Sequence, residues 1–304
     1  MPCGKLSGGG TFVAPGEQPE VRLLIVDDDE SALFALGALL EPTGAVVVRA
    51  RDGEEALAAF ADGDFAAVLL DVGMPGIDGF EVAERIKSHR TSQHVPIIFL
   101  TGRIDEAEIR RGYEVGAVDY LLKPIDADVL VAKVGTFVDL ARLRHETAVL
   151  THRALHDPLT GLANRTLFFD RCEQAITRLG RDTRALGVVF LDLDDFKEVN
   201  DQHGHDTGDR LLIEAAARLQ STIRAVDTAA RFGGDEFLVL CENIAAADDI
   251  ERLQLRIVES LGDTAPPIRA SIGYAVTEDP ETTAEEIVRA ADHAMLRSKS
   301  LAKR

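Results

Sequence analysis

Short apolar runs alternate with helical patterns through the first part of the chain. The runs lie at residues 21–26, 45–48, 66–70, 96–100 and 118–122, and the helical patterns lie at 30–40, 53–60, 79–88 and 105–115. Nearly continuous apolar strands that alternate with helices are typical of a parallel sheet covered by helices on both faces. We therefore expect an α/β domain of doubly wound (βα)5 form, with its chemistry at the carboxyl ends of the strands.

Residues 126–155 contain no proline and a single glycine, Gly135, which predicts one long helix. Along it, Leu130, Val134, Phe137 and Ala141 recur at steps of four, three and four residues. This spacing resembles a short heptad seam, so we expect a linker or stalk helix with a pairing face. The alternative is that this helix packs entirely on its own domain.

The pattern changes after residue 157. Helical patterns lie at 164–179, 208–223, 247–261 and 283–299, strand patterns lie at 186–191 and 268–276, and a hairpin lies at 229–240. This βααββαβ-like order predicts an α+β layer with a mostly antiparallel sheet. We thus expect a flexible tail at 1–19, a first domain at 20–137, a stalk helix at 126–155 and a second domain at 156–304.

Composition agrees with two soluble domains. The chain has 304 residues, of which 46% are hydrophobic and 28% are charged. That length suggests two domains with cores of their own. Its 33 basic and 52 acidic residues give a net charge of −19, and this acidic excess argues against a nucleic-acid partner, which would need clustered Lys and Arg.

The sequence also points to the cytoplasm. Its apolar runs are shorter than the roughly 18 residues that a membrane helix needs, so we expect no membrane span. The Gly-rich start lacks the apolar stretch of a signal peptide. Three cysteines, at positions 3, 172 and 241, are odd in number and have no metal-ligand spacing, which argues against a disulfide framework.

Polar residues gather at the ends of the predicted parallel strands. Asp27 and Asp28 follow the first strand, Asp71 ends the third, Thr101 ends the fourth and Lys123 ends the fifth. An acidic residue at one strand end is more often a cap or a solvated group, but five polar groups at the carboxyl ends of four strands are harder to dismiss. Crowded carboxylates stay ionised around a hard cation, so the set predicts a magnesium-dependent phosphoryl-transfer site.

These residues, together with the run from Asp71 to Gly79 (DVGMPGIDG), Thr101-Gly102 and Lys123-Pro124, resemble the receiver domain of two-component response regulators over residues 20–137. The resemblance implies that Asp71 accepts a phosphoryl group from a histidine kinase. It also implies a switch formed by Thr101 and Tyr120. The family usually has Ala at the position of Gly102, and this departure is expected to loosen the following loop.

The same resemblance assigns the remaining groups of this site. Asp27, Asp28 and Asp71 would hold one Mg²⁺ together with the carbonyl of Gly73, and Lys123 would contact the phosphoryl group. New negative oxygens would draw Thr101 inward, and the space that it leaves would admit Tyr120.

A second group of acidic residues surrounds the predicted hairpin. Gly233 and Gly234 suit a tight turn, and Asp235 and Glu236 follow them directly. By itself this sequence is most often a solvated turn. Asp192, however, ends the strand at 186–191, and if the hairpin pairs with that strand, Asp192 and Asp235 can chelate a divalent metal between them.

Downstream of Asp192, Asn200 and Asp209 flank a predicted turn that is rich in Gly and His. A carboxylate can accept hydrogen bonds from the N1 and N2 edge of guanine, and an Asn amide can add selectivity. His203 and His205 could be mistaken for metal ligands, but we interpret them as turn-stabilising residues.

The second domain resembles the GGDEF diguanylate cyclase domain over residues 156–304. The resemblance rests on the runs DPLTGLANR at 157–165, DLDDFKEVND at 192–201, GGDEF at 233–237, SIG at 271–273 and ADHA at 291–294. It implies condensation of two GTP molecules to cyclic di-GMP and two pyrophosphates. Because each domain would bind one GTP, two copies must face each other in a homodimer.

The resemblance also implies roles for single residues. Asp192, Asp235 and the Leu193 carbonyl would hold two Mg²⁺, and Asp235 and Glu236 would help to deprotonate the attacking 3′-hydroxyl. Asn200 and Asp209 would bind guanine. The groups expected to hold the phosphates are the backbone amides of Asp195 and Phe196 and the side chains of Lys299 and Lys303.

The last helix departs from the family pattern. Leu296, Ala302 and Lys303 stand where the family usually has Tyr, Gly and Arg. Lys keeps the charge of Arg but loses its bidentate fork, so weaker phosphate binding is expected there.

Arg224 and Asp227 stand where the family places an inhibitory product-binding RxxD motif. We expect product inhibition by cyclic di-GMP at this position, and the alternative is a local ion pair.

The main interpretation is a phosphorylation-controlled diguanylate cyclase. The second is a catalytically weak domain that senses GTP or cyclic di-GMP. A transcription factor would need a basic recognition helix, and the sequence shows none.

Overall fold

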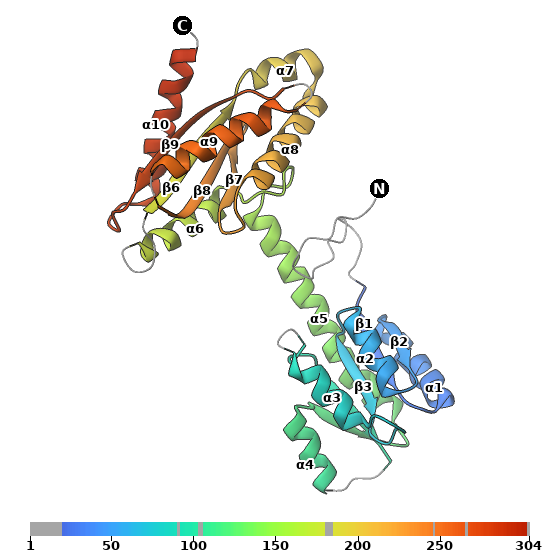
Figure 1. Cartoon of the computed structure of the whole chain (residues 1–304). Coiled ribbons are helices and arrows are strands. Elements are labelled where there is room, and N and C mark those ends of the chain that lie inside the picture. The colour runs from blue at the N-terminus through green and yellow to red at the C-terminus, as the bar shows by residue number, and fades with distance from the viewer. Residues whose placement is uncertain are drawn as a thin grey trace. The chain divides into compact units, whose positions relative to one another are not determined.

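The computed structural model describes residues 20–89, 92–102, 106–179, 185–245, 247–264 and 267–302. The expected tail at 1–19 and Lys303 lie outside these residues. The chain divides into two compact units, Met1–Ala148 and Val149–Arg304. Figure 1 shows both units.

The first unit alternates strands and helices, as the apolar pattern predicted. Its elements are β1 (Arg22–Val26), α1 (Glu30–Leu40), a 3₁₀ turn (Glu41–Thr43), β2 (Val46–Ala50), α2 (Gly53–Ala61), β3 (Ala67–Asp71), α3 (Gly79–Ser88), β4 (Ile97–Thr101), α4 (Glu106–Val115), β5 (Asp119–Leu122) and the first part of α5 (Ala127–Leu155). Within the described residues the strands form a parallel sheet in the order β2-β1-β3-β4-β5. The predicted doubly wound α/β fold is confirmed.

The central strands β1, β3 and β4 are buried on both faces, because their successive side chains point to opposite sides and helices cover both. In β1, Leu24 and Val26 join a core with α2 and α3, whereas Leu23 and Ile25 join a core with α1 and α5. Apolar side chains therefore pack with helices on both faces of the sheet. This packing holds its carboxyl edge in place, where the candidate phosphoryl-transfer residues lie.

Helix α5 begins by packing on the sheet of its own unit. Leu130, Val134 and Val138 are fully buried in the core that α1 shares, and Phe137 packs against it. The predicted pairing seam is therefore wrong in its first half, where those side chains already have a partner in the same unit. Farther along the helix, the apolar residues Leu140, Leu143 and Leu150 are exposed.

The second unit contains an antiparallel sheet between two helical layers (Figure 1). Its elements are the end of α5, then α6 (Arg165–Arg178), β6 (Ala185–Leu193), α7 (Phe196–His203), α8 (His205–Thr222), β7 (Thr228–Gly233), β8 (Glu236–Ile244), α9 (Ala247–Gly262), β9 (Ala270–Thr277) and α10 (Ala284–Ala302). In the part of the chain that the structure describes, the sheet order is β7-β8-β6-β9, with every pair antiparallel. The predicted α+β layer is confirmed.

Alternation along β6 divides the core of this unit. Val189 and Leu191 pack with α8 and α9 on one face, whereas Val188 and Phe190 pack with α6 and α10 on the other. The central position of β6 between β8 and β9 places Asp192, near its end, beside residues from both neighbours.

The segment between Asn200 and Asp209 differs from the predicted turn. Helix α7 ends at His203, Gly204 adopts φ +82°, and α8 begins at His205. Both histidines thus lie at helix ends on either side of one glycine. Among the described residues, no helix is long and apolar enough to cross a membrane.

Candidate functional site

The carboxyl edge of the parallel sheet gathers an acidic cluster. Ligand oxygens of Asp27, Asp28 and Asp71 all lie within 4.8 Å of one another. Asp27 follows β1 and Asp71 ends β3, so the pairing of these strands brings them together. The backbone of Gly73 is close as well, because a Cβ built there would lie 3.9 Å from Asp71 Oδ2. Three carboxylates with a nearby backbone are an oxygen donor set that suits Mg²⁺.

Lys123 neutralises part of this cluster. Its Nζ lies 2.7 Å from Asp27 Oδ2 and 2.7 Å from Asp71 Oδ1. Burial disfavours the charged ammonium, but the hydrogen bonds and attraction of both carboxylates outweigh it and raise the pKa of Lys123 above its usual value. The side chain therefore remains a cation beside the carboxylate of Asp71.

Thr101 and Tyr120 occupy neighbouring strands near this cluster. Thr101 is buried at the end of β4, and the backbone N–H of Lys123 donates to its carbonyl at 2.8 Å. Tyr120 is half-buried, with its ring centroid 5.4 Å from that of Phe99. The loop that follows Gly102, which was expected to be loosened, lies outside the described residues.

Gly112 of α4 makes room for the Tyr120 side chain. A Cβ built on Gly112 would lie 1.5 Å from the Tyr120 hydroxyl oxygen and 2.6 Å from Cζ. Such distances are impossible for real atoms, so any side chain at position 112 must displace the ring. The sequence offered no signal for this role, because it depends on two elements meeting in space.

We expect Gly112→Ala to destabilise the first unit by about 1–3 kcal/mol, because the added methyl overpacks the site of Tyr120. Gly135→Ala is the matched control, because its Cβ would meet no described atom within 4 Å. There a helical Gly→Ala change should add about 0.5–1 kcal/mol of stability. Urea unfolding measures both. Equal effects of the two substitutions would contradict the role assigned to Gly112.

The second group of acidic residues meets at one end of the antiparallel sheet. Asp192 is opposite Glu236 in the pairing of β6 with β8 and opposite Ser271 in the pairing with β9. The backbone N–H of Leu193 donates to the carbonyl of Asp235 at 3.1 Å. The hairpin therefore pairs beside β6, as the metal-chelation hypothesis required, and the carboxylates supply oxygen donors of the kind that Mg²⁺ prefers.

Lys299 from α10 also reaches this group, with its Nζ 2.5 Å from Asp192 Oδ1. Burial, followed by the nearby charges of Asp192, Asp235 and Asp292, raises the pKa of Glu236. Asp292 received no role in the sequence analysis. It stands on a separate helix, and only the packing of α10 against the sheet brings its charge near Glu236.

Asn200 lies in α7 with a side-chain oxygen that has no partner. Asn200 Oδ1 is buried and accepts no hydrogen bond from any described protein atom. Asn200 Oδ1 packs against Gly208 of α8, and a Cβ built on Gly208 would lie only 2.0 Å from this oxygen. Asp209, the next residue, is exposed. An orphaned buried amide oxygen is costly unless something else supplies a donor, so this position suits a ligand with N–H groups.

The segment before α7 offers backbone amides. Asp195 has a positive φ of 59° and forms no side-chain cap, and α7 begins at Phe196. The first N–H groups of a helix have no partner within the helix and favour anions. The backbone N–H groups of Asp195 and Phe196 therefore lie where an anion can bind.

Arg224 and Asp227 form a compact turn at the start of β7. Asp227 accepts hydrogen bonds from the backbone N–H of Arg224 at 3.0 Å and of Glu242 at 3.3 Å, and burial raises its pKa. A small cavity of about 30 Å³ next to it is also lined by Arg256 of α9. Arg256 could not be expected here from the sequence, because it stands far along the chain from Arg224 and Asp227.

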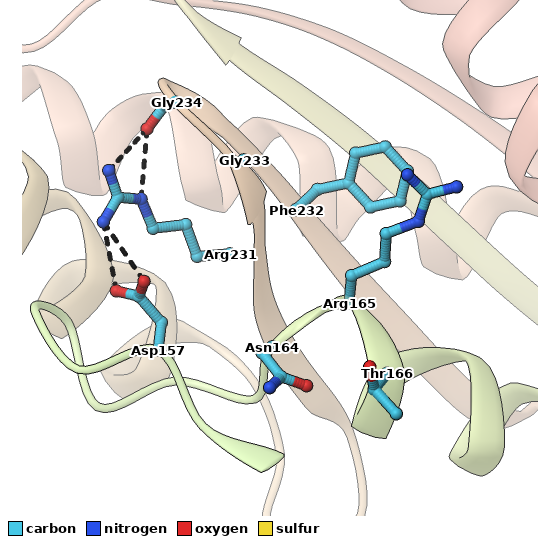
Figure 2. A pocket seen from close by; sticks show the side chains of 8 residues that line it. All are labelled: Asp157, Asn164, Arg165, Thr166, Arg231, Phe232, Gly233 and Gly234. Carbon is cyan, nitrogen blue, oxygen red and sulfur yellow. Dashed lines mark hydrogen bonds and ion pairs between the residues drawn. The ribbon is translucent and has the colours of Figure 1, made fainter. Parts of the chain in front are cut away.

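A larger cavity of about 380 Å³ lies beside the Gly233–Gly234 turn (Figure 2). The guanidinium of Arg165, at the start of α6, stacks over the Phe232 ring at 4.6 Å from its centroid. Arg231 lines the same cavity and binds Asp157 and Gly234. Neither arginine was expected from the sequence to have a role of its own.

Family models match both units of the chain. The model described as "Response regulator receiver domain" matches residues 23–135, and the model described as "Diguanylate cyclase, GGDEF domain" matches residues 154–304.

Curated proteins are also similar to this chain. The response regulator PleD of Caulobacter vibrioides is 30% identical over 291 residues, which cover 92% of this chain and 64% of PleD. The bifunctional diguanylate cyclase/cyclic di-GMP phosphodiesterase MucR of Pseudomonas aeruginosa is 46% identical over 165 residues, which cover 53% of this chain and 24% of MucR. The chain thus spans less than two thirds of either relative.

A solved structure also resembles the second unit. It contains the coiled coil and GGDEF domain of DgcB from Caulobacter crescentus in complex with c-di-GMP, and it is 25% identical with a TM-score of 0.53. The similarity covers 57% of this chain and 94% of the DgcB chain.

Proposed function

We propose that this chain, which belongs to the response regulators with a receiver domain and a GGDEF output domain, is a diguanylate cyclase controlled by phosphorylation of Asp71. The observation that carries the catalytic part is the meeting of Asp192 with Glu236 across β6 and β8, with Asp235 at the adjoining turn. The observation that supports control is the cluster of Asp27, Asp28 and Asp71.

In the proposed reaction each GGDEF domain binds one GTP, and two domains face each other in a homodimer. The 3′-hydroxyl oxygen of one GTP attacks the α-phosphorus of the other, and the bond to pyrophosphate breaks. Repeating the step in the other direction closes the ring of cyclic di-GMP. Glu236, with Asp235, accepts the proton that the hydroxyl loses.

Asp192, Asp235 and the Leu193 carbonyl would hold two Mg²⁺ in the cyclase site, and Asp27, Asp28, Asp71 and the Gly73 carbonyl would hold one in the receiver. These ions neutralise phosphate charge when bound. The N–H groups at the start of α7 and the ammonium of Lys299 orient the phosphates. Lys303, also assigned to phosphate binding, lies outside the described residues.

Asn200 and Asp209 are proposed to select guanine. The unpartnered Oδ1 of Asn200 supports this role, because the N1 and N2 groups of guanine are hydrogen-bond donors.

We expect Gly208→Ala to weaken GTP binding about 2- to 12-fold, the effect of losing one hydrogen bond. The new methyl would displace Asn200 Oδ1, from which it would be 2.0 Å away. Gly262→Ala is the control, because a Cβ there would meet no described atom within 4 Å. Calorimetry with a non-hydrolysable GTP analogue measures the change. Unaltered affinity in Gly208→Ala would remove Asn200 from guanine recognition.

In the receiver, a cognate histidine kinase is the proposed phosphodonor. A carboxylate oxygen of Asp71 attacks the phosphorus of the kinase's phosphohistidine, the P–N bond breaks and the histidine leaves, and Lys123 stabilises the transferred phosphoryl group. Thr101 and Tyr120 then change position, and the altered receiver favours the dimer. We further propose that cyclic di-GMP inhibits the enzyme through Arg224 and Asp227. The position of Arg256 beside them supports this assignment, because a second guanidinium favours the phosphates of the product.

One experiment tests the main proposal. The purified chain is incubated with GTP and Mg²⁺, with and without beryllofluoride, and cyclic di-GMP is quantified by chromatography. Product is expected in both conditions, with more in the presence of beryllofluoride. Absence of product in both would contradict the cyclase.

The second candidate function is a sensor of GTP or cyclic di-GMP without significant turnover. The departure of the last helix from the family pattern favours the sensor. Leu296, which is half exposed, stands where the family usually has Tyr. Tight nucleotide binding in the same sample without product would support the sensor.

A further inference from the structure

Arg231 joins two segments of the second unit that are far apart in sequence. Its Nη1 donates to both carboxylate oxygens of Asp157, at 3.1 Å and 3.2 Å. Its Nε and Nη2 donate to the carbonyl of Gly234, at 3.0 Å and 2.8 Å. Figure 2 shows the guanidinium between these two partners. One side chain thus binds the segment after α5 and the turn that precedes Asp235.

The Asp157 end of this link is firmly held. Asp157 lies two residues after the end of α5 and accepts hydrogen bonds from the backbone and hydroxyl of Thr160, at 2.8 Å and 2.7 Å. Burial alone would raise the pKa of Asp157, but the hydrogen bonds from Thr160 and Arg231 outweigh it and lower the pKa. The carboxylate therefore stays charged and oriented toward Arg231.

The Gly234 end fixes the peptide that leads into Asp235. Gly234 has a φ of +52°, a conformation that a turn needs and that favours glycine. Its carbonyl takes two donors from one planar group, so the peptide plane between Gly234 and Asp235 has a defined orientation. On the other side, the Leu193 N–H holds the carbonyl of Asp235 at 3.1 Å.

Burial makes this link specific. The side chains of Arg231 and Asp157 are only 15% and 18% exposed, so removing one partner leaves a largely desolvated charge. Arg can serve both partners because its donors form a rigid planar fork. Lys presents a single ammonium on a flexible chain and cannot reproduce this geometry.

We propose that Arg231 is a positioning residue that fixes the Gly233–Gly234 turn to Asp157. A shift of the segment after α5 would then change the orientation of Asp235. The catalytic consequence rests on the proposed cyclase function, whereas the positioning itself is a property of the folded domain. The inference is therefore testable without turnover.

Hydrogen–deuterium exchange on the full chain provides that test. In Asp157→Asn, exchange at residues 233–236 should rise about 10-fold, the effect of losing a charge-assisted hydrogen bond, while the rest of β8 stays protected. The control is Glu242→Gln, which breaks the 2.5 Å pair with Arg178 elsewhere on β8 and should leave the turn unchanged. Unchanged exchange at the turn in Asp157→Asn, or a uniform rise in both variants, would overturn the inference.

Substitutions of Arg231 separate positioning from simple charge neutralisation. Arg231→Lys keeps the charge, so neutralisation predicts a normal turn, whereas positioning predicts fast exchange. If a lone buried charge prevents folding, the double variant Asp157→Asn/Arg231→Met removes both charges and should show the same fast exchange. A protected turn in the folded Lys or double variant would contradict the proposal.

Turnover gives an independent readout. Asp157→Asn should lower kcat about 10- to 100-fold with KM for GTP little changed, because misplacement of a reacting group affects the chemical step. If the unaltered chain makes no cyclic di-GMP, the function proposal fails while the exchange result still decides the positioning role. If the chain is active and Asp157→Asn has normal kcat, the positioning role in catalysis is rejected.

Discussion

Replacing Glu236 with Gln is expected to lower kcat for cyclic di-GMP formation about 10²- to 10⁴-fold, the usual contribution of general base catalysis. The substitution keeps the size of the side chain and removes its charge. Glu236 faces Asp192 across the sheet, and its pKa is raised by burial and by the surrounding carboxylates. The loss should be large because the Gln amide cannot take up the proton that the attacking hydroxyl releases.

The control for this prediction is Glu242→Gln on the same strand. Glu242 pairs with Arg178 and lies away from Asp192 in the strand register. It should leave kcat unchanged within a factor of about 2, the scale of a surface ion pair. Product formation over time, measured at saturating GTP, distinguishes the two variants. Comparable turnover in Glu236→Gln would show that another group accepts the proton.

The carboxyl edge of the receiver could be predicted because strand ends are visible in the sequence. Asp27 and Asp71 each follow an apolar run, and parallel strands place such positions at one edge. The structure brings both within hydrogen-bond distance of Lys123. The apolar pattern and the parallel topology were together enough to predict that these residues lie at one edge of the sheet.

Helix α7 shows where the pattern carries too little information. Its eight residues, Phe196–His203, include none that are buried. Its apolar residues, Phe196 and Val199, are too few to identify a helix by periodicity, and no helix was predicted for this segment. The contact of Asn200 with Gly208 depends on this helix, so the sequence could suggest the residue but could not show its unpartnered oxygen.

Helix α5 shows a different limit. An apolar stripe shows that one face of a helix is buried, but it does not identify the element that buries it. Leu130 and Val134 matched a pairing seam, yet they pack on the sheet of their own unit. The link between Asp157 and Arg231 was missed for a related reason, because partners 74 positions apart share no local pattern.

Asp71→Asn is expected to abolish activation by beryllofluoride and by acetyl phosphate, and to leave basal cyclic di-GMP formation intact. Beryllofluoride and phosphoryl groups bind a carboxylate oxygen, and the Asn amide lacks the negative charge and nucleophilicity that this requires. Asp71 is buried at the end of β3, where Lys123 pairs with it and with Asp27.

The matched control is Asp62→Asn, an exposed carboxylate at the end of α2 in the same domain. It should keep the activation ratio of the unaltered chain, whereas Asp71→Asn should bring that ratio to about one, as expected when the modified group is lost. Labelling with radioactive acetyl phosphate gives a second readout that does not depend on turnover. Because Lys123 would keep its pair with Asp27 in Asp71→Asn, the domain should still fold. Activation or labelling that persists in Asp71→Asn would therefore place the phosphoacceptor elsewhere.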